Sequence, residues 1–103
     1  MIPDHLGEAT EIFELQTFEH HGETYTLKKP LECVLSLDEG RYKLENKYFD
    51  IWVHGYSKEQ VEEALKEEMA FLYHGYYKED DERLSKCAQY LKQKLGEYFT
   101  DSP

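Results

Sequence analysis

Between Ser57 and Tyr76 the apolar residues recur with the period of an α-helix. At about 100° per residue, one stripe holds Val61, Leu65, Met69, Leu72 and Tyr76. Ser57 is followed by Gln60 in a capping-box pattern, so we expect the helix to begin at Ser57. The end of the helix is open, because Gly75 could cap it while Tyr76 and Tyr77 could extend it.

The opposite face of this helix is polar and mostly acidic. It carries Glu62, Glu63, Lys66, Glu67 and His74. The apolar arc is wider than a helix lying on a sheet alone requires, since Ala64, Phe71 and Tyr73 flank the stripe. We therefore expect this helix to contact a sheet on one side and a second helix on the other.

Three segments before the helix alternate with the period of β-strands. Leu31–Leu37 alternates apolar and polar residues, Asp38–Gly40 forms a tight turn, and Arg41–Glu45 alternates again. The third segment, Tyr48–His54, directs Phe49, Ile51 and Val53 to one face. The pattern predicts a three-stranded antiparallel sheet with one buried face.

The other face of the third predicted strand is aromatic, because it carries Tyr48, Trp52 and His54. An aromatic outer face needs a cover. Either the N-terminal part of the chain folds over it, or a partner or a second copy of the chain does. Periodicity assigns faces to residues but not neighbours to faces, so both alternatives stay open.

The N-terminal part of the chain has weaker patterns. Residues 1–9 show no period and are expected to be loose. Residues 10–30 are expected to form a β-hairpin extension, with a turn at His20–Glu23 and a return arm at Tyr25–Leu27 that ends before Pro30.

The C-terminal part predicts a second helix. Four acids at Glu79–Glu82 suit the positive end of a helix dipole, with Asp80 or Asp81 as the cap. Its apolar stripe holds Leu84, Cys87, Ala88, Leu91, Leu95, Tyr98 and Phe99. The sequence thus predicts one α+β domain over residues 1–103, with a β-β-β-α-α core at 31–99: a three-stranded antiparallel sheet, two packed helices and the N-terminal β-hairpin.

The charge balance narrows the class of partner. Asp and Glu number 22 against 12 Lys and Arg, which gives a formal net charge of -10. Approach to nucleic-acid phosphates or anionic membranes would be repulsive, so we expect neither, whereas a basic protein is complementary. No apolar run reaches the roughly 18 residues of a membrane span, and the first residues lack the pattern of a signal peptide. We expect a cytoplasmic protein.

Candidate chemistry is sparse. Cys33 and Cys87 are expected as buried thiols in a reducing compartment, with a disulfide between them as the alternative. The pair His20–His21, with Glu19 or Glu23, suggests a metal site. However, adjacent strand residues point to opposite faces, so the two histidines can converge only in a special turn. We expect a turn with two surface histidines and no metal. We predict no cofactor, no catalytic residue and no enzyme.

One stretch resembles a known family. It is LECVLSLDEGRYKLENKYFDIWVHGYSKEQVEEALKEEMAFLY, in which three strands lead to Gly55, Ser57 and a helix with Glu62, Glu63, Ala64 and Leu65. This order is similar to the N-terminal domain of HicB-like antitoxins. The chain departs from that family at Asn46–Tyr48, where a Pro-rich segment is usual, and it lacks the DNA-binding module.

The resemblance implies a protein that neutralises a small basic ribonuclease toxin, self-associates, and does not bind its own operator. We therefore predict a non-enzymatic antitoxin-like protein. The predicted contact residues are aromatic at Tyr48, Trp52 and His54 and acidic at Glu62, Glu63 and Glu67. The alternative is a free-standing, self-associating scaffold or regulatory domain of unknown ligand, in which the aromatic face forms a homodimer.

Overall fold

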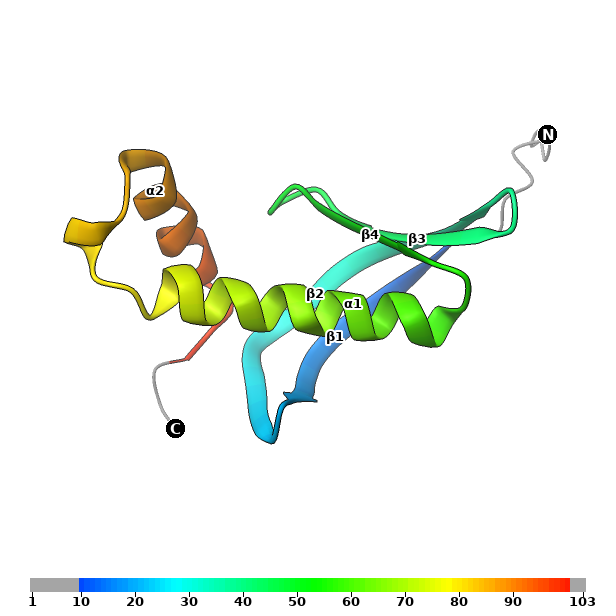
Figure 1. Cartoon of the computed structure of the whole chain (residues 1–103), viewed down its shortest axis with the longest axis horizontal. Helices are drawn as coiled ribbons and strands as arrows, with labels where there is room; N and C mark the ends of the chain where they lie inside the picture. Colours follow the sequence, from blue (N-terminus) through cyan, green and yellow to red (C-terminus); the bar gives the residue numbers. More distant parts are fainter. Residues whose placement is uncertain (1–9, 101–103) are drawn as a thin grey trace. The chain divides into compact units, whose positions relative to one another are not determined.

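The computed structural model describes residues 10–100. Its elements, in chain order, are β1 (Thr10–His20), β2 (Glu23–Asp38), β3 (Arg41–Asn46), β4 (Ile51–Gly55), α1 (Lys58–Leu72), the π-helix η2 (Tyr73–Tyr77), the 3₁₀ turn η3 (Asp81–Arg83) and α2 (Lys86–Leu95) (Figure 1). The class is α+β, as predicted, with an antiparallel sheet and two α-helices. In the part of the chain that is described, no helix is long and apolar enough to cross a membrane.

The sheet has four strands in the order β1-β2-β3-β4, so the prediction of three strands is wrong. The expected hairpin extension supplies the difference. Its return arm does not end before Pro30 but continues as one strand to Asp38. β2 pairs with β3 only from Val34 to Asp38, so the missing N–H of Pro30 interrupts no ladder bond on that side.

Contacts divide the chain into two units, and β1, β2 and α1 each run from one unit into the other. In the described residues, unit 1 comprises 10–14 and 32–65, and unit 2 comprises 15–31 and 66–100. The buried apolar side chains of unit 1 are Cys33, Leu35, Leu44, Phe49, Ile51, Val61 and Leu65. Those of unit 2 are Leu15, Phe18, Tyr25, Leu27, Leu31, Met69, Ala70, Leu72, Leu95 and Phe99.

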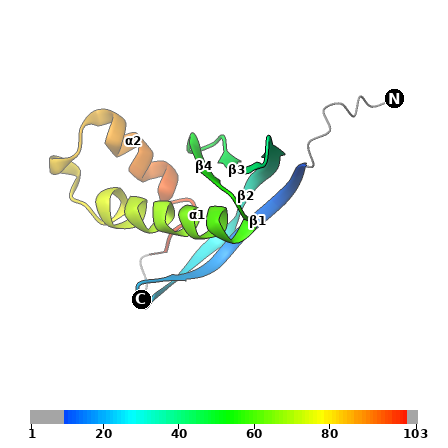
Figure 2. The same cartoon turned by 45° about the vertical axis from the view of Figure 1, so that its right-hand side comes forward.

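In unit 1 the start of α1 lies beside β4 (Figure 2). The Ser57 Oγ accepts from the Gln60 N–H at 3.1 Å, and the Gln60 Oε1 accepts from the Tyr56 N–H at 2.7 Å. The predicted capping box therefore forms, with its return bond one residue before the cap. A Cβ on Gly55 would lie 2.9 Å from the Gln60 Cβ, so this close approach of strand and helix requires glycine.

The turn between β3 and β4 depends on Asn46, the buried polar residue of the sheet. Its Nδ2 donates to the Glu32 carbonyl at 3.0 Å, and its Oδ1 accepts from the Phe49 N–H at 2.8 Å. The turn delays the last strand, which begins at Ile51 and not at the predicted Tyr48. Phe49 is buried, as predicted, but from the turn.

In unit 2 the α1 helix does not end at Gly75. It continues as the π-helix η2, in which the Lys78 N–H donates to the Tyr73 carbonyl at 2.9 Å. Of the two ends left open, the extension through Tyr76 and Tyr77 is therefore the one observed. The Tyr77 ring lies 5.6 Å from the Phe99 ring, which follows α2.

The predicted cap of the second helix is wrong. Ser85 is the N-cap of α2, and its Oγ accepts from the Ala88 N–H at 3.2 Å. Asp81 instead starts η3 and pairs with the Lys92 Nζ at 2.8 Å. The later start leaves Cys87 exposed in the first turn, so its predicted burial is also wrong, whereas Cys33 is buried as predicted; both are free thiols.

Candidate functional site

Trp52 and His54 lie on the open face of the sheet in unit 1. Burial alternates along β4, with Ile51 buried and Trp52 exposed over 55% of its surface. The register places Trp52 opposite Glu45, and Glu45 opposite Val34, which is 41% exposed. We call the set Val34, Lys43, Glu45, Trp52 and His54 the outer sheet face. Tyr48, also exposed, lies in the turn that precedes β4.

The predicted acidic residues lie on α1 and not on the sheet. Val61 and Leu65 are fully buried, and in unit 1 the apolar surface available to them is the other face of the sheet. Glu62 is half-buried and Glu63 is exposed, both on the helix side of this layer. Within unit 1 the aromatic and acidic contact residues thus occupy opposite sides of a helix-on-sheet layer. Glu67, also exposed, belongs to unit 2.

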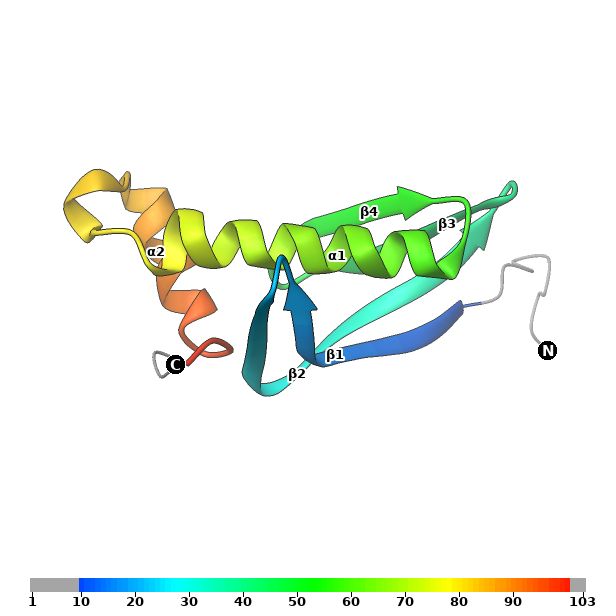
Figure 3. The same cartoon turned by 60° about the horizontal axis from the view of Figure 1, so that its bottom comes forward.

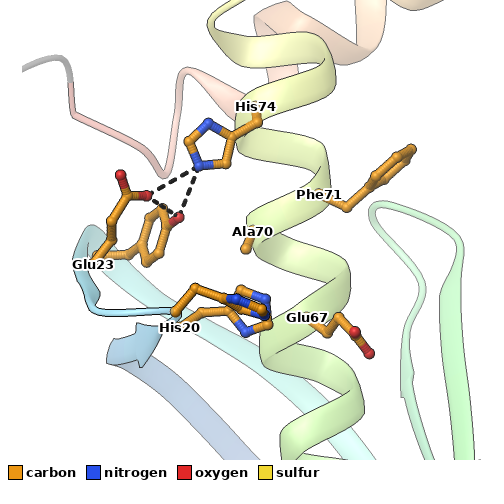
Figure 4. A pocket seen from close by; sticks show the side chains of 8 residues that line it. His20, Glu23, Glu67, Ala70, Phe71 and His74 are labelled. Carbon is orange, nitrogen blue, oxygen red and sulfur yellow. Dashed lines mark hydrogen bonds and ion pairs between the residues drawn. The ribbon is translucent and has the colours of Figure 1, made fainter.

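Unit 2 contains a pocket of about 270 Å³ that the sequence did not predict. The β1–β2 hairpin (Figure 3) and the C-terminal part of α1 both contribute residues to it. Its lining comprises His20, His21, Glu23, Tyr25, Glu67, Ala70, Phe71 and His74 (Figure 4). One wall therefore comes from the hairpin turn and the other from the end of α1 and η2.

The hairpin turn brings two histidines together. His21 and Gly22 have φ values of 52° and 82°, as a two-residue hairpin turn with positive φ at both positions requires. The rings of His20 and His21 then lie with centroids 4.1 Å apart. Convergence of two adjacent histidines requires a special turn, and the turn predicted at His20–Glu23 takes such a conformation. Even so, no group of three or more His, Cys, Asp or Glu side chains within the described residues is arranged to hold a metal ion.

Beside the histidine pair, Glu23, Tyr25 and His74 form a closed hydrogen-bonded cluster (Figure 4). The Tyr25 hydroxyl donates to the Glu23 Oε1 at 2.7 Å, and the His74 Nε2 lies 3.1 Å from the same oxygen and 3.0 Å from the hydroxyl. A carboxylate can only accept, so the Nε2 of His74 carries a proton in this arrangement.

The cluster fixes two protonation states. Hydrogen bonds from Tyr25 and then His74 lower the pKa of Glu23. Burial of the ring and then the bond to Glu23 raise the pKa of Tyr25 to about 12. At neutral pH the cluster therefore presents one carboxylate and one neutral phenol.

His74 lies near the start of the π-helix, on the same face as Glu67, Ala70 and Phe71, because positions 67, 70, 71 and 74 share one side of a helix. The π-helix is rare and occurs frequently at functional sites. The ring of its first residue, Tyr73, packs edge-on against the ring of Tyr25 in β2, with centroids 5.3 Å apart, and against the ring of Phe99 after α2, with centroids 4.9 Å apart. These contacts hold the segment between β2 and the C-terminal part of unit 2. The YHGYY run carries no sequence signature of this conformation, whereas the HHG run is compatible with a turn that needs positive φ.

Other polar groups of the pocket have no partner. Across residues 10–100, the rings of His20 and His21 and the carboxylate of Glu67 make no hydrogen bond or ion pair. Phe71 is 60% exposed at the rim. The pocket thus combines acceptors, negative charge and aromatic surface, which suits a cationic group.

The fold and these two surfaces define an α+β protein with an exposed aromatic sheet face and a small acidic pocket. No protein-family model, curated protein or solved structure matches the chain. The resemblance to HicB-like antitoxins stays a prediction.

Proposed function

We propose that this chain is a non-enzymatic, cytoplasmic binding protein that masks a small basic protein, which the HicB-like resemblance implies to be a ribonuclease toxin. The observation that carries the proposal is the outer sheet face around Trp52. A tryptophan exposed over 55% of its surface on the open face of a sheet is a strong interface candidate, because tryptophan dominates binding energy at many interfaces.

The charge supports a basic partner. A net charge of -10 attracts a basic protein over a distance of about a Debye length and raises its association rate. Trp52 would supply apolar contact, with Tyr48 and His54 beside it, while the acids of α1 would steer approach. Glu62 and Glu63 lie on the helix side of unit 1, so we expect them to affect rate and salt dependence more than residence time.

The test is capture of partners by the tagged chain from its host's lysate at low salt, followed by mass spectrometry and an RNA-cleavage assay before and after denaturing release. A small basic protein that cleaves RNA only after release would support the proposal. Trp52→Ala should weaken the complex roughly 30-fold, the scale of one hot-spot residue. Tyr56→Ala is the matched control, because Tyr56 is 72% exposed but lies outside the outer sheet face.

Two outcomes count against the proposal. If charge reversal at Glu63 and Glu67 together with Trp52→Ala leaves binding unchanged, the assigned contact residues are wrong. If only the bait is recovered, with the mass of a dimer that Trp52→Ala converts to a monomer, the outer sheet face joins two copies of the chain and the self-associating scaffold replaces the antitoxin.

A further inference from the structure

The pocket of unit 2 has features of a binding site that the outer sheet face does not explain. Its volume of about 270 Å³ lies just below the roughly 300–1,000 Å³ of pockets for small molecules. A space of this size suits one side chain of a partner better than a large cofactor. From the lining we infer that the pocket binds an arginine side chain. The arginine would belong to the basic protein of the proposed function, so the inference rests on that function.

The carboxylates of the lining favour a cation. Glu23 and Glu67 contribute two of them, the other ionisable side chains are three histidines and Tyr25, and no lysine or arginine lines the pocket. Glu23 is held ionised by its hydrogen bonds to Tyr25 and His74, whereas Glu67 makes no ion pair within residues 10–100. An unpaired, exposed carboxylate can accept a bidentate pair of N–H groups, which guanidinium supplies.

The aromatic surface favours arginine over lysine. Phe71 and the adjacent rings of His20 and His21 all line the pocket. A guanidinium is planar, weakly hydrated and stacks on aromatic faces, while an ammonium is a compact and strongly hydrated charge. The ring nitrogens of the two histidines also offer acceptors for the remaining N–H groups of arginine.

The walls are held in place before any ligand arrives. His21 is kept at a positive φ by the hairpin turn, and η2 fixes His74 against Glu23 and Tyr25. Only Glu67 and Phe71, both exposed, have to adjust. Preorganisation of this kind reduces the entropic cost of binding one side chain.

The test uses N-acetyl-argininamide as the probe and the imidazole proton resonances of His20, His21 and His74 as the readout. We expect saturable shifts of these resonances. The citrulline analogue, which is nearly isosteric but neutral, should give no saturable shift, and N-acetyl-lysinamide should bind several-fold more weakly.

Variants locate the site. Glu67→Gln should weaken binding of the arginine derivative roughly tenfold, because a charge-assisted pair becomes a neutral one, and Phe71→Ala should weaken it several-fold. Glu63→Gln, on the same helix but outside the pocket, is the matched control and should bind normally. A second control, Glu59→Gln, replaces an exposed α1 residue that belongs to no proposed binding surface, and it decides the comparison in place of Glu63→Gln. The side chains of Glu67, Phe71 and Glu59 are exposed, so the variants should fold, which circular dichroism checks.

Equal binding of the arginine and citrulline derivatives, or normal binding by Glu67→Gln, would overturn the inference. Saturable binding of inorganic phosphate at the same resonances would overturn it as well, since the pocket would then hold anions. These failures are distinct from failure of the proposed function. If the pocket binds the arginine derivative but no basic partner is captured, only the proposed function is refuted. If a partner binds through Trp52 but the pocket binds no arginine derivative, only the inference about the pocket is refuted.

Discussion

Replacing Tyr25 with phenylalanine tests the cluster of Glu23, Tyr25 and His74. The substitution keeps the ring, which stacks on Phe18 at 4.8 Å and meets Tyr73 edge-on, and removes only the hydroxyl. Near neutral pH the variant loses a hydrogen bond to a carboxylate. Because Glu23 is exposed, we expect a loss of about 1 kcal/mol of unfolding free energy, below the usual range for bonds to charged groups.

The pH dependence is the sharper test. Burial raises the pKa of Tyr25 from 10.0 to about 12, so the phenol ionises in the unfolded chain before it ionises in the folded one. The stabilisation is fully present below about pH 10 and is lost as the pH rises toward 12. A pKa shift of two units corresponds to about 2.7 kcal/mol of unfolding free energy. Solvent screening by the exposed partners reduces this to about half. By about pH 10.5, either value predicts a loss of about 0.7 to 0.8 kcal/mol.

The assay is urea unfolding followed by circular dichroism, at about pH 8 and about pH 10.5, with the difference between wild type and Tyr25→Phe compared at each pH. Ionisation of the buried Cys33 thiol at high pH lowers the unfolding free energy of both proteins equally, so it cancels in their difference. We expect the difference to fall from about 1 to about 0.3 kcal/mol. Tyr90→Phe, an exposed tyrosine of α2, should match wild type at both values. A difference for Tyr25→Phe that stays constant with pH would refute the burial and bonding of this hydroxyl.

Two further predictions concern buried groups, one tested by a substitution and one by a labelling reaction. Asn46→Ala should lower the unfolding free energy by roughly 2 kcal/mol, because it removes the partners of the Glu32 carbonyl in β2 and of the Phe49 N–H in the β3–β4 turn. Lys47→Ala in the same turn should change it by less than about 0.5 kcal/mol, and equal urea midpoints for the two variants would contradict this. Alkylation of the folded protein should modify exposed Cys87 and spare Cys33, whose pKa burial raises to about 12, and peptide mass mapping that finds comparable labelling would contradict the buried assignment.

Where local signals determine an element, the sequence predicted it well. The capping box at Ser57 and the apolar stripe of Val61 and Leu65 both appear as expected, because a helix start and a helix face depend on residues within one or two turns. The strand through Pro30 was missed for the opposite reason. Whether a proline is tolerated in a strand depends on which neighbour that strand pairs with, and pairing with β3 begins only at Val34.

Competing local signals explain the shifted element boundaries. The alternation of Phe49 and Ile51 extends through the turn that Asn46 holds, so the pattern alone placed the last strand too early. Both Asp81 and Ser85 are good caps, and the choice between them is decided by a contact distant in sequence, since Lys92 pairs with Asp81. Among the predicted contact residues, the exposure of Trp52 and of Glu63 followed from periodicity. That Trp52 and Glu63 lie on opposite sides of a helix-on-sheet layer could not be predicted, because periodicity does not show on which face of the sheet the helix packs.

The pocket could not be predicted from pattern, because periodicity places Glu67 and His74 on one helix face but does not bring the hairpin turn to that face. A hairpin turn of this type favours Asn-Gly, yet this chain has His21 before Gly22, and a non-glycine residue at positive φ carries a cost of roughly 1 kcal/mol. Glu39 and Gly40 show the same pair of positive φ values, 53° and 82°, so two tight turns of the sheet accept this cost. The neighbours of Trp52 can be assigned only from the register, which places it opposite Glu45 on the outer sheet face, and over half of its surface stays open to a partner there.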